Sequence, residues 1–281
     1  MGAQSQVFVQ KKEVRTDSDA SFYVASLVLN NAKQANALSG SMLRDIQKEL
    51  ATLAQDPSIR VLLVRGAGKH FCAGADLNWM KKSASLGHAE NLAEADELAK
   101  MFQLISSMPF PTVAVVRGAV YGGGVGLVAA CDYAMADSTA RFCLSEVKIG
   151  LIPAVILPYL KQKLRAGDLT RLALTARIFS AADAASYGLV QNVANEGDLD
   201  KTCLDELNLL LQASPEAQKA FKTLQKKLAW QHSNTQELTS SAIANIRASE
   251  EGKHGLERFF NKEQPEWVCS LEKLGTLFED R

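Results

Sequence analysis

The chain has 281 residues, of which 47% are hydrophobic and 22% are charged, as is usual for a globular protein. Its 31 basic residues balance 31 acidic residues, so no net positive field favours nucleic acid. No apolar run is long enough to cross a bilayer, the N-terminal segment lacks the core of a signal peptide, and the five scattered cysteines have no zinc spacing. We therefore expect a cytoplasmic protein with reduced thiols, and no metal, nucleic-acid or membrane partner.

The first third of the chain predicts a hairpin, a helix and a buried strand. Polar and apolar residues alternate in Val7–Val14 and Ser21–Leu29, which predicts two paired strands. Ser39 is placed to cap a helix that continues to about Ala54 with one apolar stripe. The short run Val61–Val64 is fully apolar, which is typical of a sheet covered on both faces.

A loop of small residues, His70–Leu77, follows that strand. The small residues Ala73-Gly74-Ala75 expose backbone N–H groups, and one of these could pair with an N–H from the three glycines further on to hold a substrate oxygen. Asp76 is placed to cap a following helix. His70 is a candidate base without an evident orienting partner, so a structural or ligand-contacting role is favoured for it. The next residues, 81–88, are expected to be mobile and to shape a substrate entrance, and 89–107 form a helical pattern.

The stretch from Thr112 to Pro153 is the most informative part of the sequence. A buried strand, Thr112–Val116, leads into three glycines at 122–124 and then into an apolar helix at 125–131. Glycines between a strand and a helix allow close approach to a ligand, and the helix N-terminus favours negative charge. Glu146 lies in an apolar context, as either a satisfied structural acceptor or an acid/base with a raised pKa. The stretch therefore predicts a site that polarises a carbonyl group.

The remaining chain is mainly helical in pattern. The two strand–helix alternations upstream imply parallel strands. A strand is predicted at Leu189–Val193, after a short helix capped by Ser180. From Asp198 onward the predicted helices are 198–213, 215–229, 236–249 and 254–261. Their basic cluster, Lys222, Lys226 and Lys227, is interpreted as a solvated face, with anion binding as the alternative.

Three motifs, in this order, resemble those of the crotonase (enoyl-CoA hydratase/isomerase) superfamily. They read HFCAGADL at 70–77, RGAVYGGG at 117–124 and EVKIGLIP at 146–153. With the segment 181–190, they extend the resemblance from about residue 7 to residue 265.

The resemblance implies an α/β fold with a spiral of ββα turns at 1–197 and a C-terminal helical region at 198–281. That region would form a homotrimer or a dimer of trimers. The substrate would be an acyl-CoA thioester, with CoA as part of the substrate and no separate cofactor or metal.

The resemblance also implies roles for individual residues. The backbone N–H groups of Ala73 and Gly123 would form the oxyanion hole, and Glu146 would be the catalytic acid/base. The residues expected to contact CoA or substrate are Lys33, Ala75, Asp76, Leu77 and Gly124.

One position departs from the family's pattern. Hydratases of the superfamily usually carry a second glutamate two residues after the three glycines, and here that position is Gly126. A single carboxylate still permits the chemistry of the family's Δ3,Δ2-enoyl-CoA isomerases. It also permits hydration if Glu146 holds the water with backbone or substrate groups.

Within the superfamily, four segments of the sequence are most similar to methylglutaconyl-CoA hydratases of leucine breakdown and to the related isohexenylglutaconyl-CoA hydratases. The similarity lies in AGADLNWM, GGGVGL, FCLSEVKIGLIPAVILPYL and GLERFFNKEQPEW. It implies hydration of a branched double bond in a substrate with a distal carboxylate, for which Lys81, Lys82 and Arg141 are candidate cations. An isomerase, a decarboxylase or thioesterase, and a catalytically idle CoA-binding protein remain alternatives.

Overall fold

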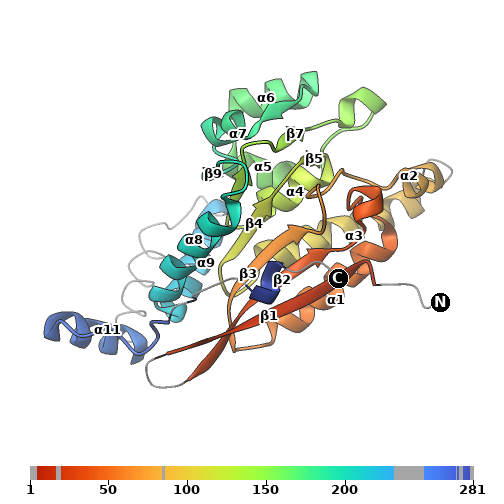
Figure 1. The fold of residues 1–281 in the computed structure, drawn as a ribbon. Coiled ribbons are helices and arrows are strands. Elements are labelled where there is room, and N and C mark those ends of the chain that lie inside the picture. Colours follow the sequence, from red (N-terminus) through yellow and green to blue (C-terminus); the bar gives the residue numbers. More distant parts are fainter. Residues whose placement is uncertain are drawn as a thin grey trace.

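The computed structural model describes residues 5–16, 20–83, 86–230, 250–269, 271 and 275–278. Its centre is a six-stranded sheet in the order β1-β2-β3-β4-β6-β9 (Figure 1). The predicted hairpin is confirmed, because β1 and β2 pair antiparallel, and the other strands pair in parallel as the strand–helix alternation requires. The strands are β1 (Val7–Arg15), β2 (Ser21–Leu29), β3 (Ile59–Gly66), β4 (Thr112–Val116), β6 (Tyr133–Asp137) and β9 (Asn192–Ala194).

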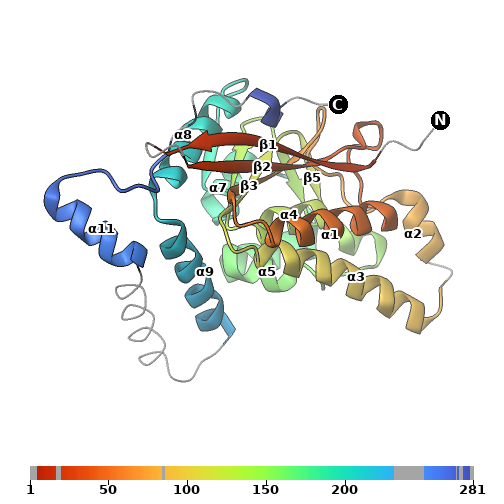
Figure 2. The ribbon, with the colours of Figure 1, turned by 90° about the horizontal axis from the view of Figure 1, so that it is seen from below.

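Helices cover both faces of this sheet. α1 (Gly40–Ala54) and α3 (His88–Ser106) lie beneath it in Figure 2, and α8 (Leu199–Gln212) packs on the opposite face. Along β3 the side chains alternate between two separate cores. Leu62 and Val64 pack with α1 and α3, whereas Val61 and Leu63 pack with α8. This alternation explains why the strand reads as a continuous apolar run.

A second, three-stranded sheet, in the order β5-β7-β8, carries the glycine and glutamate motifs. Its strands are β5 (Ala119–Tyr121), β7 (Arg141–Cys143) and β8 (Phe179–Ser180). α4 (Gly123–Ala130) begins two residues after β5, and the single 3₁₀ turn η2 (Glu146–Ile149) begins three residues after β7. Strands of two or three residues are too short to show a periodic pattern, so the sequence did not predict this sheet.

The other described elements are helical. One expectation is wrong, because the last predicted strand begins at Asn192 rather than Leu189. The expected mobility of residues 81–88 stays a prediction; within them α2 ends at Ser83 and α3 begins at His88. The predicted helix at 236–249 lies outside the described residues. α11 projects from the body of the molecule in both ribbon views. These elements are η1 (Ala32–Gln34), α2 (Leu77–Ser83), α5 (Leu157–Lys163), α6 (Ala166–Thr175), α7 (Ala181–Tyr187), α9 (Pro215–Trp230), α11 (Glu250–Asn261) and η3 (Gly275–Phe278).

The predicted boundary between residues 197 and 198 stays a prediction. Since Cys203 and Leu207 of α8 are buried against β3 and β4, α8 packs as part of the layered core. None of the described helices is both long and apolar enough to cross a membrane.

A buried arginine on β3 holds the C-terminal part of the chain against the sheet. Arg60 is 2% exposed, and its guanidinium donates to the carbonyls of Leu211, Ala213 and Trp267 at 3.2, 2.9 and 2.9 Å. These three acceptors belong to segments on either side of α9 and α11. Arg60 therefore supplies hydrogen-bond donors to backbone carbonyl groups that are not paired within the sheet.

Replacing Arg60 by alanine would remove the guanidinium donor from all three carbonyl groups, although the Leu211 carbonyl would keep the Cys269 N–H at 3.4 Å. We expect the free energy of unfolding to fall by about 3 kcal/mol, as measured by urea denaturation. Arg171→Ala, at an exposed position of α6, is the control and should change it by less than about 0.5 kcal/mol. Equal stability of the two variants would show that Arg60 does not hold the C-terminal segments.

Candidate active site

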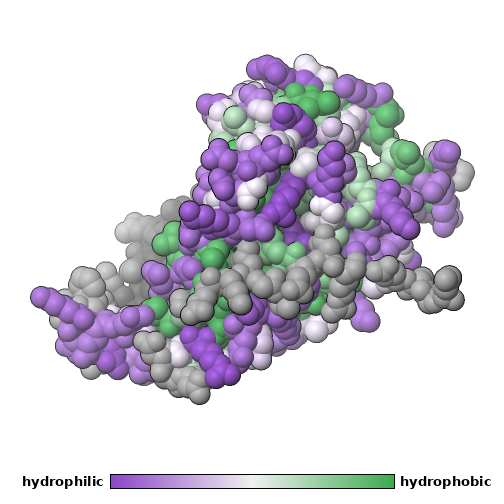
Figure 3. Space-filling model, in the orientation of Figure 1, coloured by the Kyte–Doolittle hydropathy of each residue, from purple (hydrophilic) through white to green (hydrophobic). Residues whose placement is uncertain are grey.

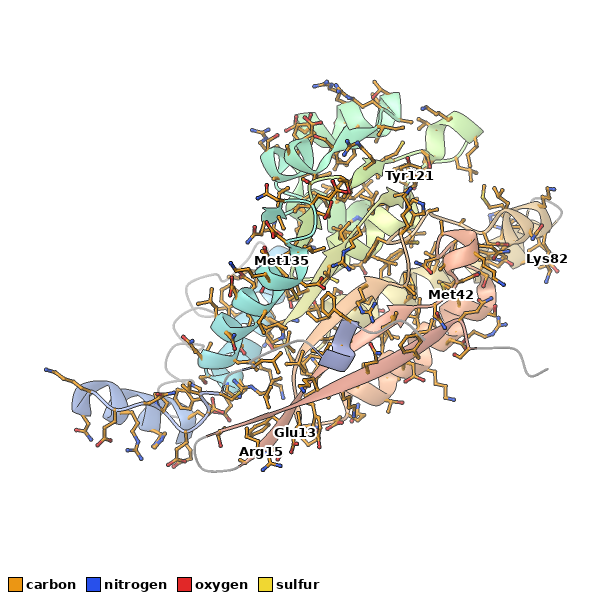
Figure 4. The ribbon with its side chains drawn as sticks, in the orientation of Figure 1. Glu13, Arg15, Met42, Lys82, Tyr121 and Met135 are labelled. Carbon is orange, nitrogen blue, oxygen red and sulfur yellow. The ribbon has the colours of Figure 1, made fainter. Side chains whose placement is uncertain are left out.

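Three short parallel segments bring the sequence motifs to one edge. Cys72 forms a parallel bridge with Val120, and Val120 pairs in parallel with Phe142. The backbone N–H of Tyr121 donates to the Cys72 carbonyl at 3.0 Å, and the next N–H along the chain donates to the Cys143 carbonyl at 2.9 Å. Because parallel segments end at the same edge, residues 73–75, 122–124 and 145–146 meet there. Figure 4 labels Tyr121 at the end of β5, next to this edge.

Two of the three glycines are required by close contacts. Gly122 has φ +48°, and a Cβ on it would lie 3.2 Å from Glu146 Oε1. A Cβ on Gly124 would lie only 2.4 Å from the Cys72 carbonyl oxygen. The glycines therefore allow the Glu146 carboxyl and the 72–75 loop to approach one backbone segment from two sides.

The structure contradicts Ala73 as an oxyanion donor. Its N–H donates to the Ala35 carbonyl at 2.9 Å and is not available to a ligand. Two residues further, the N–H of Ala75 has no acceptor among the described residues. The N–H of Gly123, in the first turn of α4, has none in this part of the chain either. Ala75 and Gly123 are therefore the two candidate donors for a thioester oxygen, which corrects the pair expected from the sequence.

Glu146 carries the titratable group of this edge. Its Oε2 is buried and has no hydrogen-bond partner among the described residues. Burial raises the pKa of the Glu146 carboxyl, partly offset by a hydrogen bond from its own backbone N–H. Of the two interpretations open from the sequence, the satisfied structural acceptor is excluded for Oε2. An unpaired carboxyl with a raised pKa is suited to proton transfer.

The residues predicted to contact CoA come from η1, from the segment that leads into α2 and from the first turn of α4. Lys33 is exposed on η1, two residues before Ala35, the residue that binds the Ala73 N–H. Asp76 caps α2, because its Oδ1 accepts the N–H groups of Asn78 and Trp79 at 3.0 and 2.9 Å. The Leu77 side chain is 73% exposed at the start of α2.

His70 positions backbone and does not present a free base. Its Nδ1 accepts the Ala119 N–H at 3.0 Å, so the nitrogen lone pair that a base would need is used to join the two loops. The sequence analysis missed a second positioning residue, Asn36. Its Nδ2 donates to the carbonyls of Ala67 and His70 at 2.9 and 2.7 Å, from a backbone with φ +54°. Asparagine is among the residues that tolerate this φ, which is the only signal the sequence offered.

The position of the missing second glutamate is filled by other side chains. A Cβ on Gly126 would lie 2.2 Å from Ile156 Cγ2 and 2.9 Å from Phe102 Cζ. Both side chains are buried, and they come from the segment before α5 and from α3. Ile156 and Phe102 therefore occupy the space that a side chain at position 126 would need.

The fold and the site together define a class of protein. It is a layered α/β protein in which two backbone N–H groups and one buried carboxyl face a common edge. Such an edge can polarise a carbonyl group and move a proton next to it. Among the described residues, no three His, Cys, Asp or Glu side chains come together as metal ligands.

Comparison with known proteins assigns the family. Residues 19–269 match the sequence model described as enoyl-CoA hydratase/isomerase, so the chain belongs to this family, the crotonase superfamily. The enoyl-CoA hydratase ACTT6 of Alternaria alternata is 33% identical over 240 residues, 83% of this chain and 77% of that protein. The mevalonyl-coenzyme A hydratase SIDH of Beauveria bassiana is 31% identical over 278 residues, 94% of this chain and 99% of that one.

Solved structures confirm the fold. The crystal structure of an enoyl-CoA hydratase from Shewanella pealeana superposes with a TM-score of 0.83 at 37% identity, over 92% of this chain and 95% of that one. The expected crotonase fold is therefore confirmed.

The buried Glu146 carboxyl should cost stability when it is ionised. Because its pKa is raised above the unfolded value of about 4.3, the ionised form is disfavoured in the folded state at higher pH. Glu146→Gln should therefore raise the Tm relative to the wild type, by an amount that grows as the pH rises through the raised pKa. The exposed Glu97→Gln is the control and should show no such growth. A Tm difference that is flat or falls with pH would contradict the assignment.

Gly126→Ala should overpack the junction of α3, α4 and Ile156. We expect a loss of about 1–3 kcal/mol in the free energy of unfolding. In the double variant with Ile156→Ala, the total loss should be smaller than the sum of the two single losses, because the truncated side chain vacates the space. Gly167→Ala is the matched helical control, since a Cβ there would meet nothing within 4 Å. Additive losses would show that Ile156 does not fill the Gly126 position.

Proposed function

We propose that the chain is a hydratase of a branched enoyl-CoA thioester, with 3-methylglutaconyl-CoA of leucine breakdown as its substrate. The observation that carries the proposal is the Glu146 carboxyl beside the glycines, whose buried Oε2 has no hydrogen-bond partner in the described part of the chain. Family membership supports acyl-CoA chemistry, and the motifs shared with methylglutaconyl-CoA hydratases support the substrate. A relative named as a mevalonyl-coenzyme A hydratase supports hydration as the reaction type.

The proposed mechanism uses the backbone donors first. The N–H groups of Ala75 and Gly123 hold the thioester oxygen, and each donor lowers the barrier by roughly 3 kcal/mol as negative charge develops there. The substrate double bond between C2 and C3 is then polarised, so that C3 accepts a nucleophile.

Glu146 moves the protons. Its ionised carboxylate takes a proton from a water molecule as the water oxygen bonds to C3, and the electron pair of the double bond passes to the enolate. The protonated Glu146 then returns that proton to C2, so that the elements of one water are added overall. A general acid/base of this kind contributes roughly 10²- to 10⁴-fold in rate.

CoA binding is assigned to residues of η1, of the segment that leads into α2 and of the first turn of α4. The Lys33 ammonium would contact a phosphate, and the backbone from Ala75 to Leu77, with Gly124, would follow the thioester arm. CoA is part of the substrate, and no separate cofactor is proposed. Lys81 and Lys82, on α2 directly after this motif, are the proposed partners of the distal carboxylate. The Arg141 guanidinium instead donates to the carbonyls of Thr139 and Ala140 at 3.0 and 2.9 Å.

One observation favours a second candidate, a Δ3,Δ2-enoyl-CoA isomerase. Ile156 and Phe102 fill the Gly126 position, so the water lacks the second carboxylate that two-glutamate hydratases use. In the isomerase, Glu146 would move one proton between C2 and C4 with no water added.

We also propose that the chain works in the cytoplasm as a homotrimer or a dimer of trimers. The support is an apolar surface directly after Glu146, where Ile149, Leu151 and Ile152 are 57%, 54% and 73% exposed. Figure 3 shows apolar surface at this upper end of the molecule, over η2 and α6. Large exposed apolar side chains that cluster in this way commonly mark contact with another protein.

Absorbance at the enoyl-thioester band tests the proposal. We expect 3-methylglutaconyl-CoA to lose absorbance faster than crotonyl-CoA or isohexenylglutaconyl-CoA, and Glu146→Gln to slow this loss by 10²-fold or more. Preference for the longer chain would assign the isohexenylglutaconyl substrate instead. No loss with any thioester, together with proton exchange at C4 of a 3-enoyl-CoA, would overturn the hydratase in favour of the isomerase.

A further inference from the structure

A second polar centre lies at the other end of α4, where two lysines meet one aspartate. Lys222, from the middle of α9, donates to Asp132 Oδ2 at 2.5 Å and to the Phe110 carbonyl at 2.6 Å. Lys163, from the end of α5, donates to the Asp132 carbonyl. The Lys222 side chain is 12% exposed and that of Asp132 is 27% exposed. Two ammonium groups are thus largely buried around one carboxylate.

The Asp132 carboxylate is already shared among several donors. Its Oδ2 also accepts the backbone N–H and the hydroxyl of Thr112, at 2.7 and 3.0 Å. Its charge therefore cannot compensate both lysines. An ammonium has three donors, and within the described part of the chain Lys163 uses one of them and Lys222 uses two. The cluster consequently holds excess positive charge and unused donors.

Two adjoining cavities open onto this cluster. One, of about 520 Å³, lies between α3, α5 and α9, and the other, of about 510 Å³, lies between α9 and the end of α3. α5 is seen between α3 and α9 in Figure 2. Ser106, Lys222 and Lys226 line both cavities. The charged residues among the described lining are one carboxylate, Asp132, and five lysines, Lys163, Lys219, Lys222, Lys226 and Lys227.

The energetics of the two buried lysines favour an added anion. Burial lowers the pKa of Lys163 and of Lys222, because it disfavours the ammonium form, and the Asp132 charge offsets this only in part. An anion in the cavity would stabilise both ammonium groups and restore part of the lost solvation. The neutral side-chain amides of Gln103 and Gln162, which line the cavity near the lysines, can donate further hydrogen bonds to an anion's oxygens.

This centre is separate from the thioester edge. α4 has eight residues, and such a helix is about 12 Å long. Gly123 begins the helix, whereas Asp132 follows its C-terminal end. Between the two, Ile156 and Phe102 close the space beside Gly126. The lysine cluster therefore does not belong to the oxyanion site.

We propose that the cavities between α3, α5 and α9 bind a small phosphate-bearing anion at a site distinct from the thioester edge. Lys163 and Lys222 hold the phosphate from the inner wall, and Lys226, which lines both cavities, holds it from the rim. Lysines suit this ligand because they act as point charges toward phosphate oxygens. The interpretation favoured from the sequence, a solvated face, does not explain why the Lys222 side chain is only 12% exposed.

Calorimetric titration of the full-length protein tests the proposal. Pyrophosphate is added to protein saturated with free CoA, so that the CoA site is occupied, and ADP is titrated in a second arm. We expect one saturable site. Lys226→Gln should weaken binding about tenfold, because it removes one ammonium group from the rim. The variant should keep its fold, since Lys226 makes no hydrogen bond with the described residues. Lys161→Gln, at an exposed position of α5 outside both cavities, should leave binding unchanged.

The outcomes separate the possible ligands. Tighter binding of ADP than of pyrophosphate would identify a nucleotide, and equal binding an inorganic or simple ester phosphate. Three results would overturn the proposal: no saturable binding, equal weakening by Lys226→Gln and Lys161→Gln, or, in a parallel titration of CoA-free protein, binding that is absent from the CoA-saturated protein. The last would mean that pyrophosphate had reported the CoA site alone.

Discussion

The parallel register of Cys72, Val120 and Phe142 is the constraint on which the rest of the site depends. Each of the three segments is too short to be stable alone, and each leads directly into one part of the site. Since parallel segments end at one edge, the register places the Ala75 N–H, the Gly123 N–H and the Glu146 carboxyl together with no direct side-chain link between them. His70 and Asn36 stabilise the same arrangement from behind, through hydrogen bonds to the backbone of these loops and their neighbours.

The site holds its carboxyl in an unfavourable environment. An unpaired buried oxygen costs folding free energy, and the surrounding layers must supply the compensating stability. The same burial makes Glu146 useful, because a carboxyl with a raised pKa can both accept and return a proton. Ile156 and Phe102 fill the Gly126 position, and the Asp76 carboxylate caps α2, so Glu146 is the carboxyl assigned to proton transfer at the thioester edge. The chemistry of the edge therefore depends on how the Glu146 carboxylate positions and deprotonates a water molecule.

The sequence predicted what is local and missed what is long-range. The hairpin, the Ser39-capped helix, the Gly122–Gly124 turn and Glu146 follow from patterns within a few residues, and all lie where they were expected. The choice of Ala73 failed because its N–H is used by Ala35, which is 38 positions earlier in the chain. Ile156 was missed for the same reason, since only the packing of α4 against its neighbours brings it to Gly126. Short strands such as β5 are determined by pairing, which no local pattern reports.

Isotope-edited infrared spectroscopy of a bound enoyl thioester tests the central claim most directly. The Glu146→Gln variant should bind the thioester without converting it, so the labelled carbonyl can be observed in the site. If the Ala75 and Gly123 N–H groups both donate to the oxygen, the carbonyl stretch should lie at lower wavenumber than that of the free thioester in water. A stretch at the same wavenumber as in water would contradict the account, because the carbonyl would then not be polarised at this edge.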